Sequence, residues 1–339
     1  MQRPTGFAFA ADVLPSIELT GNLTDADRQQ IDRFSSNSGL MRFDNVTYQN
    51  VTEKEFKKGD KLGSGAFGHV SKAIFSKNGK EVAVKECISS MASEGHRWLG
   101  WAKRMGRELE INSMEHQCVN LLKCYGYIIT PEFHVSMFLE LMPMSLGQLS
   151  RAAGKISDRF VGRFAVDIVA GMNYLRCTLK MVHRDLKPDN MLIDEFGTVK
   201  LADFGFIGHV LDTSVVSSTT GTLSYTAPEA LLTDHGVSPW KSSVDVWSFG
   251  ISMLELIKGE HPLDGEDQSF LHVIIPELSS EEAPYLYELI NSCLNKEPSR
   301  RPRIQDLPNH KAIQQIKGQE DIKEEVRKWL VDYLPVSAQ

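Results

Sequence analysis

The chain has 339 residues, 24% of them charged, and a formal net charge of -7 at pH 7. With no overall basic field and no apolar run near the roughly 18 residues that span a bilayer, the composition argues against a nucleic-acid partner and a membrane span. The five cysteines are scattered, odd in number and free of CxxC spacing, which favours reduced thiols and a cytoplasmic, or also nuclear, protein.

Residues 1–54 show no sustained periodicity, and the Ser- and Gly-containing run at 35–39 is typical of a flexible segment. We therefore expect a poorly ordered N-terminal extension whose apolar patches could pack locally.

Five short β-type runs follow, and together they predict a five-stranded antiparallel sheet. They lie at 61–62 leading into a glycine loop, and at 70–75, 81–86, 121–129 and 135–141. Between the third and fourth runs, the spacing of residues 96–115 predicts a helix.

After Leu146 the pattern becomes mainly helical, with apolar residues at helical spacing in 160–175, 244–257 and 283–294. These stripes predict a second, larger lobe. The tail carries one more apolar face, which we expect to dock on the domain, with a partner's groove as the alternative. That face contains Ile322, Val326, Trp329, Leu330 and Tyr333.

A glycine-rich loop lies between two of the predicted strands. Its residues are Gly63, Ser64, Gly65, Ala66, Phe67 and Gly68, flanked by Leu62 and Val70. Glycines let the backbone approach phosphate oxygens closely. A dinucleotide-binding loop would instead open a helix, whereas residues 70–75 look like a strand, so we disfavour that alternative.

The run 183–190, His-Arg-Asp-Leu-Lys-Pro-Asp-Asn, is followed thirteen residues later by Asp203-Phe204-Gly205. Asp185 would orient and deprotonate a substrate hydroxyl, while Asn190 and Asp203 supply the hard oxygen ligands that Mg²⁺ needs beside ATP phosphates. The pattern therefore predicts a phosphoryl-transfer centre.

Together these motifs resemble those of the eukaryotic protein kinase family. The resemblance implies an α+β, two-lobed fold, with a small five-stranded antiparallel β lobe carrying one regulatory helix and a larger, mainly α-helical lobe. The corresponding boundaries are an extension at 1–54, a kinase domain at 55–315 and a C-terminal amphipathic helix at 316–339. Within the domain we expect the small lobe at 55–141, the hinge at 140–146 and the large lobe at 147–315.

The resemblance also implies a nucleotide site that takes ATP with Mg²⁺. Lys85 would contact the α- and β-phosphates, with Glu108 as its carboxylate partner and Glu110 as the rival. The remaining implied contacts are apolar walls around adenine and backbone groups at its edge. The walls would be Leu62, Val70, Ala83 and Leu192, and the backbone groups those of Glu140 and Met142.

Five positions that inactive relatives of kinases often lose are filled, which favours an enzyme over an ATP-binding scaffold. They are Lys85, Glu108, Asp185, Asn190 and Asp203. Lys187 resembles the catalytic lysine of the class that phosphorylates Ser or Thr. Family resemblance also pairs Glu229 with Arg301 and makes Asp245 an anchor of the catalytic loop.

Three short segments resemble the MAP kinase kinases, in particular the stress-activated branch: the hinge, the helical tail and the activation segment. The activation segment places Thr213 and Ser217 at regulatory phosphorylation positions, with Ser218, Thr219 and Thr220 as neighbouring candidates. Phosphates there could pair with Arg184 and order the segment.

This resemblance implies that an upstream kinase activates the protein, and that the protein phosphorylates Thr and Tyr of a MAP kinase. A general Ser/Thr kinase is the alternative. Two departures stand out: Asn112 occupies a position that is usually apolar, and no basic docking motif is visible, since Arg3 stands alone before residues 17–19.

Overall fold

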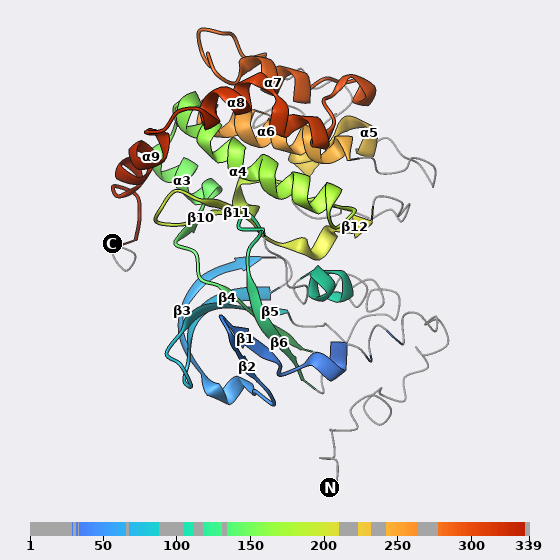
Figure 1. Cartoon of the computed structure of the whole chain (residues 1–339), viewed down its shortest axis with the longest axis vertical. Helices are drawn as coiled ribbons and strands as arrows, with labels where there is room; N and C mark the ends of the chain where they lie inside the picture. The colour runs from blue at the N-terminus through green and yellow to red at the C-terminus, as the bar shows by residue number, and fades with distance from the viewer. Residues whose placement is uncertain are drawn as a thin grey trace, which may run out of the picture. The chain divides into compact units, whose positions relative to one another are not determined.

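The computed structural model describes residues 29, 32, 34–65, 68–87, 105–111, 118–130, 134–209, 223–231, 242–262 and 277–335. The chain divides into two compact units (Figure 1). Unit 1 comprises Met1–His116 and Lys123–Leu141, and unit 2 comprises Gln117–Leu122 and Met142–Gln339. Among the described residues, no helix is both long enough and apolar enough to cross a membrane.

Unit 1 is built on an antiparallel sheet with strand order β2-β1-β6-β7-β5-β4-β3. The five predicted strands are all present, and two further strands precede them. The seven are β1 (Met41–Phe43), β2 (Val46–Tyr48), β3 (Phe56–Gly65), β4 (Gly68–Phe75), β5 (Glu81–Cys87), β6 (Cys124–Ile129) and β7 (Val135–Glu140).

The two additional strands correct the expectation of a poorly ordered extension for residues 41–48. They form a hairpin in which Phe43 pairs with Val46 across a two-residue turn, and Asp44 has a left-handed φ of 50°. Strand β1 joins the sheet where Met41 pairs with Gly126 of β6. A Cβ at Gly126 would lie 2.2 Å from the Leu40 carbonyl oxygen, so this glycine permits the close approach.

The hairpin belongs to the core of unit 1 because its aromatic side chains stack on those of the sheet. The Phe43 ring lies 4.9 Å from that of Phe75 and 4.7 Å from that of Tyr125, and Phe56 stacks on Phe138 at 3.8 Å. Phe43 and Phe75 are almost fully buried. Such aromatic pairs add about 0.5–1.5 kcal/mol each beyond their buried area.

The helix predicted at 96–115 is described only at residues 105–111. Met105 and Leu109 are buried there and pack in one cluster with Cys87 of β5, Met137 of β7 and Phe34 of the extension. The rest of the predicted range, including Asn112, lies outside the described residues.

Unit 2 is mainly helical, as expected, and its core centres on α4 and α6. Its helices are α3 (Leu146–Ala153), α4 (Asp158–Cys177), α5 (Pro228–Leu231), α6 (Ser243–Lys258), α7 (Tyr287–Cys293), α8 (Lys311–Lys317) and α9 (Ile322–Leu330). Short strands accompany them: β8 (Met144–Ser145), β9 (Met181–Val182), β10 (Met191–Ile193), β11 (Val199–Leu201) and β12 (Gly208–His209). The apolar stripes at 160–175 and 244–257 are thus confirmed as buried helix faces, and the one at 283–294 holds a shorter helix.

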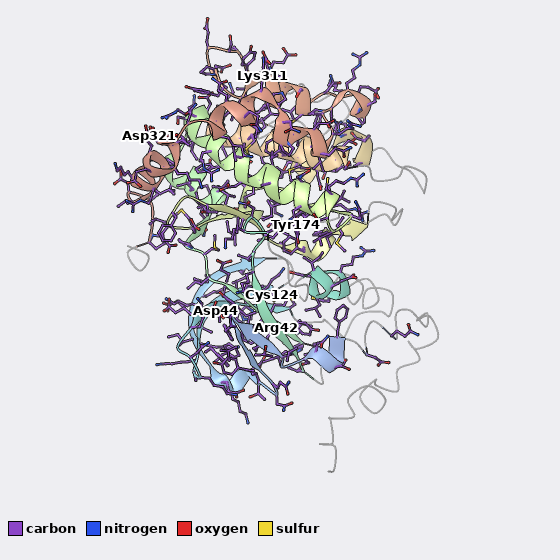
Figure 2. The ribbon with its side chains drawn as sticks, viewed as in Figure 1. Arg42, Asp44, Cys124, Tyr174, Lys311 and Asp321 are labelled. Carbon is purple, nitrogen blue, oxygen red and sulfur yellow. The ribbon has the colours of Figure 1, made fainter. Side chains whose placement is uncertain are left out.

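The tail expected as one helix over 316–339 contains one described helix, α9, which begins later, at Ile322, and ends at Leu330. Helix α8 ends at Lys317 with Gly318 as its C-cap, and Asp321 directly precedes α9 (Figure 2). The predicted docking on the domain is confirmed, because Glu325 forms an ion pair with Arg159 of α4 and the Trp329 ring lies 5.2 Å from that of Phe160.

Candidate active site

The glycine-rich loop is a hairpin between β3 and β4 in unit 1. Gly63 pairs with Val70, and Gly65 pairs with Gly68. Ala66 and Phe67, two of the predicted loop residues, lie outside the described residues. Because the loop leads into a strand and opens no helix, the structure rules out the dinucleotide-binding alternative.

Two glycines of the loop serve different purposes. Gly68 has a φ of 144°, and a Cβ there would lie 1.8 Å from the Glu86 carbonyl oxygen of β5, so the fold itself requires glycine. A Cβ at Gly63 would have no atom of the described residues within 4 Å. Packing among the described residues therefore does not explain why position 63 is a glycine. A glycine there is suited to a backbone that a phosphate approaches closely.

Lys85 of β5 pairs with Glu108 of the helix at 105–111, with 2.5 Å between Nζ and Oε1. The side chains are 14% and 2% exposed, so water screens the pair little. This contact selects Glu108 over Glu110 as the partner of Lys85.

Two of the apolar residues predicted beside adenine in unit 1, Val70 and Ala83, share a face with Lys85. Val70 is paired with Lys85 across β4 and β5, and Ala83 precedes Lys85 by two residues, which places it on the same side of the strand. Leu62 is 42% exposed. At the end of β7, the backbone N–H of Glu140 donates a hydrogen bond to the Lys123 carbonyl, 2.8 Å away.

In unit 2, a buried carboxylate holds the catalytic loop. Asp245, at the start of α6, accepts hydrogen bonds from the backbone N–H of His183 at 2.7 Å and of Arg184 at 2.8 Å. Burial raises the pKa of Asp245. Arg184 has a left-handed φ of 67°, a costly conformation that this hydrogen bonding helps to fix. The predicted anchoring role of Asp245 is thus confirmed.

Asp185 is 4% exposed and lies at the centre of the loop's polar contacts. The Asn190 side-chain amide donates to both the backbone carbonyl and Oδ2 of Asp185, each at 2.8 Å. Lys187 Nζ lies 3.2 Å from the same Oδ2. The structure therefore brings together three of the residues predicted for catalysis.

Asn190 and Asp203 are held near each other through Ala202. The Ala202 N–H donates to the Asn190 carbonyl at 2.9 Å, and its carbonyl lies 3.1 Å from Nε2 of His183. Asp203 follows with a left-handed φ of 61° and accepts the Gly205 N–H at 3.4 Å.

The donor set at these two residues fits a magnesium ion. Because the Asn190 amide nitrogen donates to Asp185, its side-chain oxygen is presented as an acceptor, and Asp203 adds a carboxylate. Hard oxygen ligands of these types are those that Mg²⁺ selects. The described part of the chain contains no cluster of three His, Cys, Asp or Glu side chains suited to a metal.

Other predicted residues fall as follows. Leu192 lies on β10, paired with Ser145 of β8. Arg301 forms the predicted pair with Glu229 through two hydrogen bonds of 2.6 and 2.8 Å, and its guanidinium lies 4.8 Å from the Trp247 ring centre. Met142 is half-buried in unit 2. Thr213, Ser217 and their neighbouring candidates lie outside the described residues.

Sequence reasoning missed two polar groups next to these residues. Glu86 of β5 receives Lys58 from β3 at 2.5 Å and His69 from β4 at 2.7 Å, and so ties together the strands that carry the glycine loop. In unit 2, Asp189 accepts a hydrogen bond from Arg151 at 2.9 Å. Alternation places Glu86 on the same side of β5 as the buried Val82 and Val84, and His69 on the same side of β4 as the buried Ala73, so it does not predict an ion pair there.

Comparisons with known proteins agree with this geometry. The family model described as Protein kinase domain matches residues 56–313. The chain is 30% identical to dual specificity mitogen-activated protein kinase kinase 7 of Homo sapiens, over 90% of this chain and 73% of that protein. It is 29% identical to dual specificity mitogen-activated protein kinase kinase mek-1 of Caenorhabditis elegans, over 83% of this chain and 79% of that protein. It is 30% identical to MAP kinase kinase MKK1/SSP32 of Saccharomyces cerevisiae, over 79% of this chain and 55% of that protein.

Proposed function

The chain belongs to the protein kinase family and has MAP kinase kinases among its relatives, and from this premise we propose that it phosphorylates Thr and Tyr in the activation loop of a MAP kinase. The arrangement of Asp185, Lys187 and Asn190 in unit 2 supports phosphoryl transfer, and the similarity to dual specificity MAP kinase kinases supports the choice of acceptor.

Protein kinases use ATP with a divalent metal, generally Mg²⁺. In this chain, Asn190 and Asp203 would hold the metal, which neutralises charge on the phosphates. Lys85, oriented by Glu108, would bind the α- and β-phosphates, and the backbone at Gly63 would follow the phosphate chain. Leu62, Val70, Ala83 and Leu192 would contact adenine, with backbone groups of Glu140 and Met142 at its edge.

Asp185 would accept the proton of the substrate hydroxyl as that oxygen attacks the γ-phosphorus. Its backbone carbonyl and Oδ2 are both fixed by Asn190, which supports a preorganised carboxylate. Lys187, 3.2 Å from Oδ2, would balance the negative charge that gathers around the transferred group.

Activation by an upstream kinase would occur at Thr213 and Ser217. Each phosphate adds roughly -1.5 to -2 charges at neutral pH, and Arg184 in the catalytic loop is a suitable partner. The Asp245 carboxylate fixes the Arg184 backbone, so such a contact would join the activation segment to a rigid support.

Two other functions compete with this one. A general Ser/Thr kinase would use the same residues on unrelated protein acceptors. An ATP-binding scaffold would bind nucleotide without turnover, but the pairing of Lys85 with Glu108 and the contacts of Asp185 favour an enzyme.

The test uses the purified Thr213→Asp, Ser217→Asp protein with Mg-ATP and a panel of catalytically dead MAP kinases. Modified residues are mapped by mass spectrometry, and the same protein carrying Asp185→Asn is the control. We expect paired Thr and Tyr modification that the control lacks. Labelling of unrelated Ser and Thr acceptors alone would favour the general kinase, and nucleotide binding without labelling would favour the scaffold.

A further inference from the structure

Strands β10 and β11 form a hairpin whose two ends carry the proposed metal ligands (Figure 1). Asn190 directly precedes β10, and Asp203 follows the end of β11 by two residues. The two ends are tied together, because the Ala202 N–H donates to the Asn190 carbonyl at 2.9 Å. The sheet is completed only by the two-residue strand β8, and so small a sheet needs packing against other elements to be stable. Whatever holds the hairpin therefore also holds the two ligands.

The turn of this hairpin is shaped by its own aspartate. Asp194 Oδ1 accepts hydrogen bonds from the backbone N–H groups of Phe196 at 2.9 Å and of Thr198 at 2.7 Å. Gly197 lies between them with a left-handed φ of 79°. Phe196 is the large apolar side chain of the turn, but it is 62% exposed and so contributes little to attaching the turn to unit 2.

The tail helix α9 supplies an apolar attachment for the turn. A Cβ at Gly197 would lie 2.9 Å from Val326 Cγ1 and 3.7 Å from Leu330 Cδ1, so both side chains lie against the turn backbone. Val326 and Leu330 are fully buried. Helix α9 is itself anchored to α4 by the ion pair of Glu325 with Arg159. The turn of the hairpin is thus connected through α9 to the main helix of unit 2.

The same helix approaches β11 beside a buried carboxylate of α4. Asp167 accepts the backbone N–H of Val199 at 3.0 Å and two hydrogen bonds from Arg163 Nη2, at 2.8 and 2.9 Å. Burial raises the pKa of Asp167, and the charges of Arg163 and of Lys323 on α9 oppose that rise. Lys323 therefore helps to keep Asp167 in the ionised form, which is the better acceptor for the β11 N–H.

We propose that α9 positions the metal ligands Asn190 and Asp203 by holding the β10–β11 hairpin at its turn. The inference rests on the proposed function, because it needs these two residues to bind the metal that accompanies ATP. Close-packed interiors transmit displacements, since neighbouring side chains leave little room to absorb them. A hairpin held at its turn by Val326 and Leu330 keeps a fixed direction, and so do the ligands at its other end. Val326 and Leu330 are thus positioning residues that act through the hairpin.

The competing explanation is that α9 packs on unit 2 for stability alone. Leu330→Ala tests the contact with the turn, and Ile316→Ala is the matched control because it removes the same number of carbon atoms from an equally buried site. Ile316 of α8 packs on α4 instead, where a Cβ at Gly162 would lie 2.9 Å from its Cδ1. A role limited to stability would make the two variants alike.

The first measurement is hydrogen–deuterium exchange of the full chain without nucleotide. Lost global stability speeds exchange everywhere, so the quantity compared is the exchange rate of residues 190–203 relative to that of α6. We expect this ratio to rise about 3- to 10-fold in Leu330→Ala and to stay within about twofold of wild type in Ile316→Ala.

The second measurement is calorimetric titration with ATP, with and without Mg²⁺. In Leu330→Ala, the affinity for ATP with Mg²⁺ should fall about 3- to 10-fold, because displaced ligands bind the metal less well. The affinity for ATP without Mg²⁺ should change by less than about twofold, since the hairpin ends bind the metal and not the nucleotide directly. Ile316→Ala should resemble wild type in both titrations.

Equal exchange ratios in the two variants would overturn the inference, as would an unchanged affinity of Leu330→Ala for ATP with Mg²⁺. Val326→Ala removes a smaller part of the same contact and gives the same comparison if Leu330→Ala does not fold. If the wild-type protein binds no ATP even with Mg²⁺, the proposed function fails and this inference fails with it. If it binds ATP with Mg²⁺ and Leu330→Ala behaves like Ile316→Ala, only the inference fails.

Discussion

In unit 2, backbone hydrogen bonds to the buried Asp245 hold the catalytic loop, whereas in unit 1 the Lys85–Glu108 pair depends on how a short helix packs against the sheet. A carboxylate that accepts two backbone N–H groups fixes the chain in one conformation. The described part of the helix, 105–111, is held against the sheet by the side chains of Met105 and Leu109. The difference teaches that the fold fixes the catalytic loop through backbone hydrogen bonds, while side-chain packing alone places Glu108 beside Lys85.

The largest expected effect comes from the fixed loop. Asp185→Asn removes the proton acceptor but keeps the shape of the side chain, so turnover should fall by about 10²- to 10⁴-fold. Nucleotide affinity should change much less. Single-turnover kinetics and ATP titration measure both quantities, and loss of ATP binding instead of turnover would contradict the proposed role.

Asp245→Asn tests whether the loop depends on its buried anchor. An amide can accept one of the two N–H groups but presents its own NH₂ to the other, so we expect a loss of about 3 kcal/mol in the free energy of unfolding. Chemical denaturation of the purified protein gives this value. A change below about 0.5 kcal/mol would mean that the loop is held by other contacts.

Glu108→Gln tests the contact between Lys85 and Glu108 in unit 1. Losing a charge-assisted hydrogen bond to Lys85 should lower kcat/KM for ATP by about 10- to 100-fold, and because the pair is buried, the free energy of unfolding should also fall by about 1–3 kcal/mol. Glu110→Gln, two residues away on the same helix, is the control and should stay close to wild type. If the two variants behave alike, the pairing seen here does not govern activity.

The smallest expected effect concerns Glu86, which forms ion pairs with Lys58 and His69 on the two strands that flank the glycine-rich loop. Because these partners are largely exposed, the pairs are worth little, and Glu86→Gln should raise KM for ATP by about two- to fivefold with kcat nearly unchanged. Glu81→Gln removes a comparable exposed pair, with Lys72, away from the loop and serves as the control. An equal change in both variants would remove any specific role for Glu86.

Resemblance to the motifs of the kinase family predicted the parts of the site that lie at fixed positions in the chain. It paired Lys85 with Glu108 and Glu229 with Arg301, and it assigned Asp245 to the catalytic loop. These contacts were predictable because each residue belongs to a motif with a characteristic interval from the next.

Contacts made only by the folded chain were not predictable in this way. Strands β1 and β2 have three residues each, too few for periodicity to stand out, although the alternation around Asp44-Asn45 is consistent with a hairpin. Gly147, for example, lies so close to Asp189 that a Cβ there would be 2.2 Å from Asp189 Oδ1. The two residues belong to segments that meet only in the tertiary structure. Gly318 caps α8 and separates it from α9, so the tail helix begins at Ile322 and not at residue 316.

The aromatic stacking of Phe43 has a practical consequence for choosing the boundaries of an expressed fragment. The matched family region starts at residue 56, so a fragment trimmed to that boundary would lack the hairpin and leave the rings of Phe75 and Tyr125 facing water. Such a shortened protein should be prone to precipitation during purification. Expression boundaries for this enzyme are better drawn from its side-chain packing than from the extent of its family module.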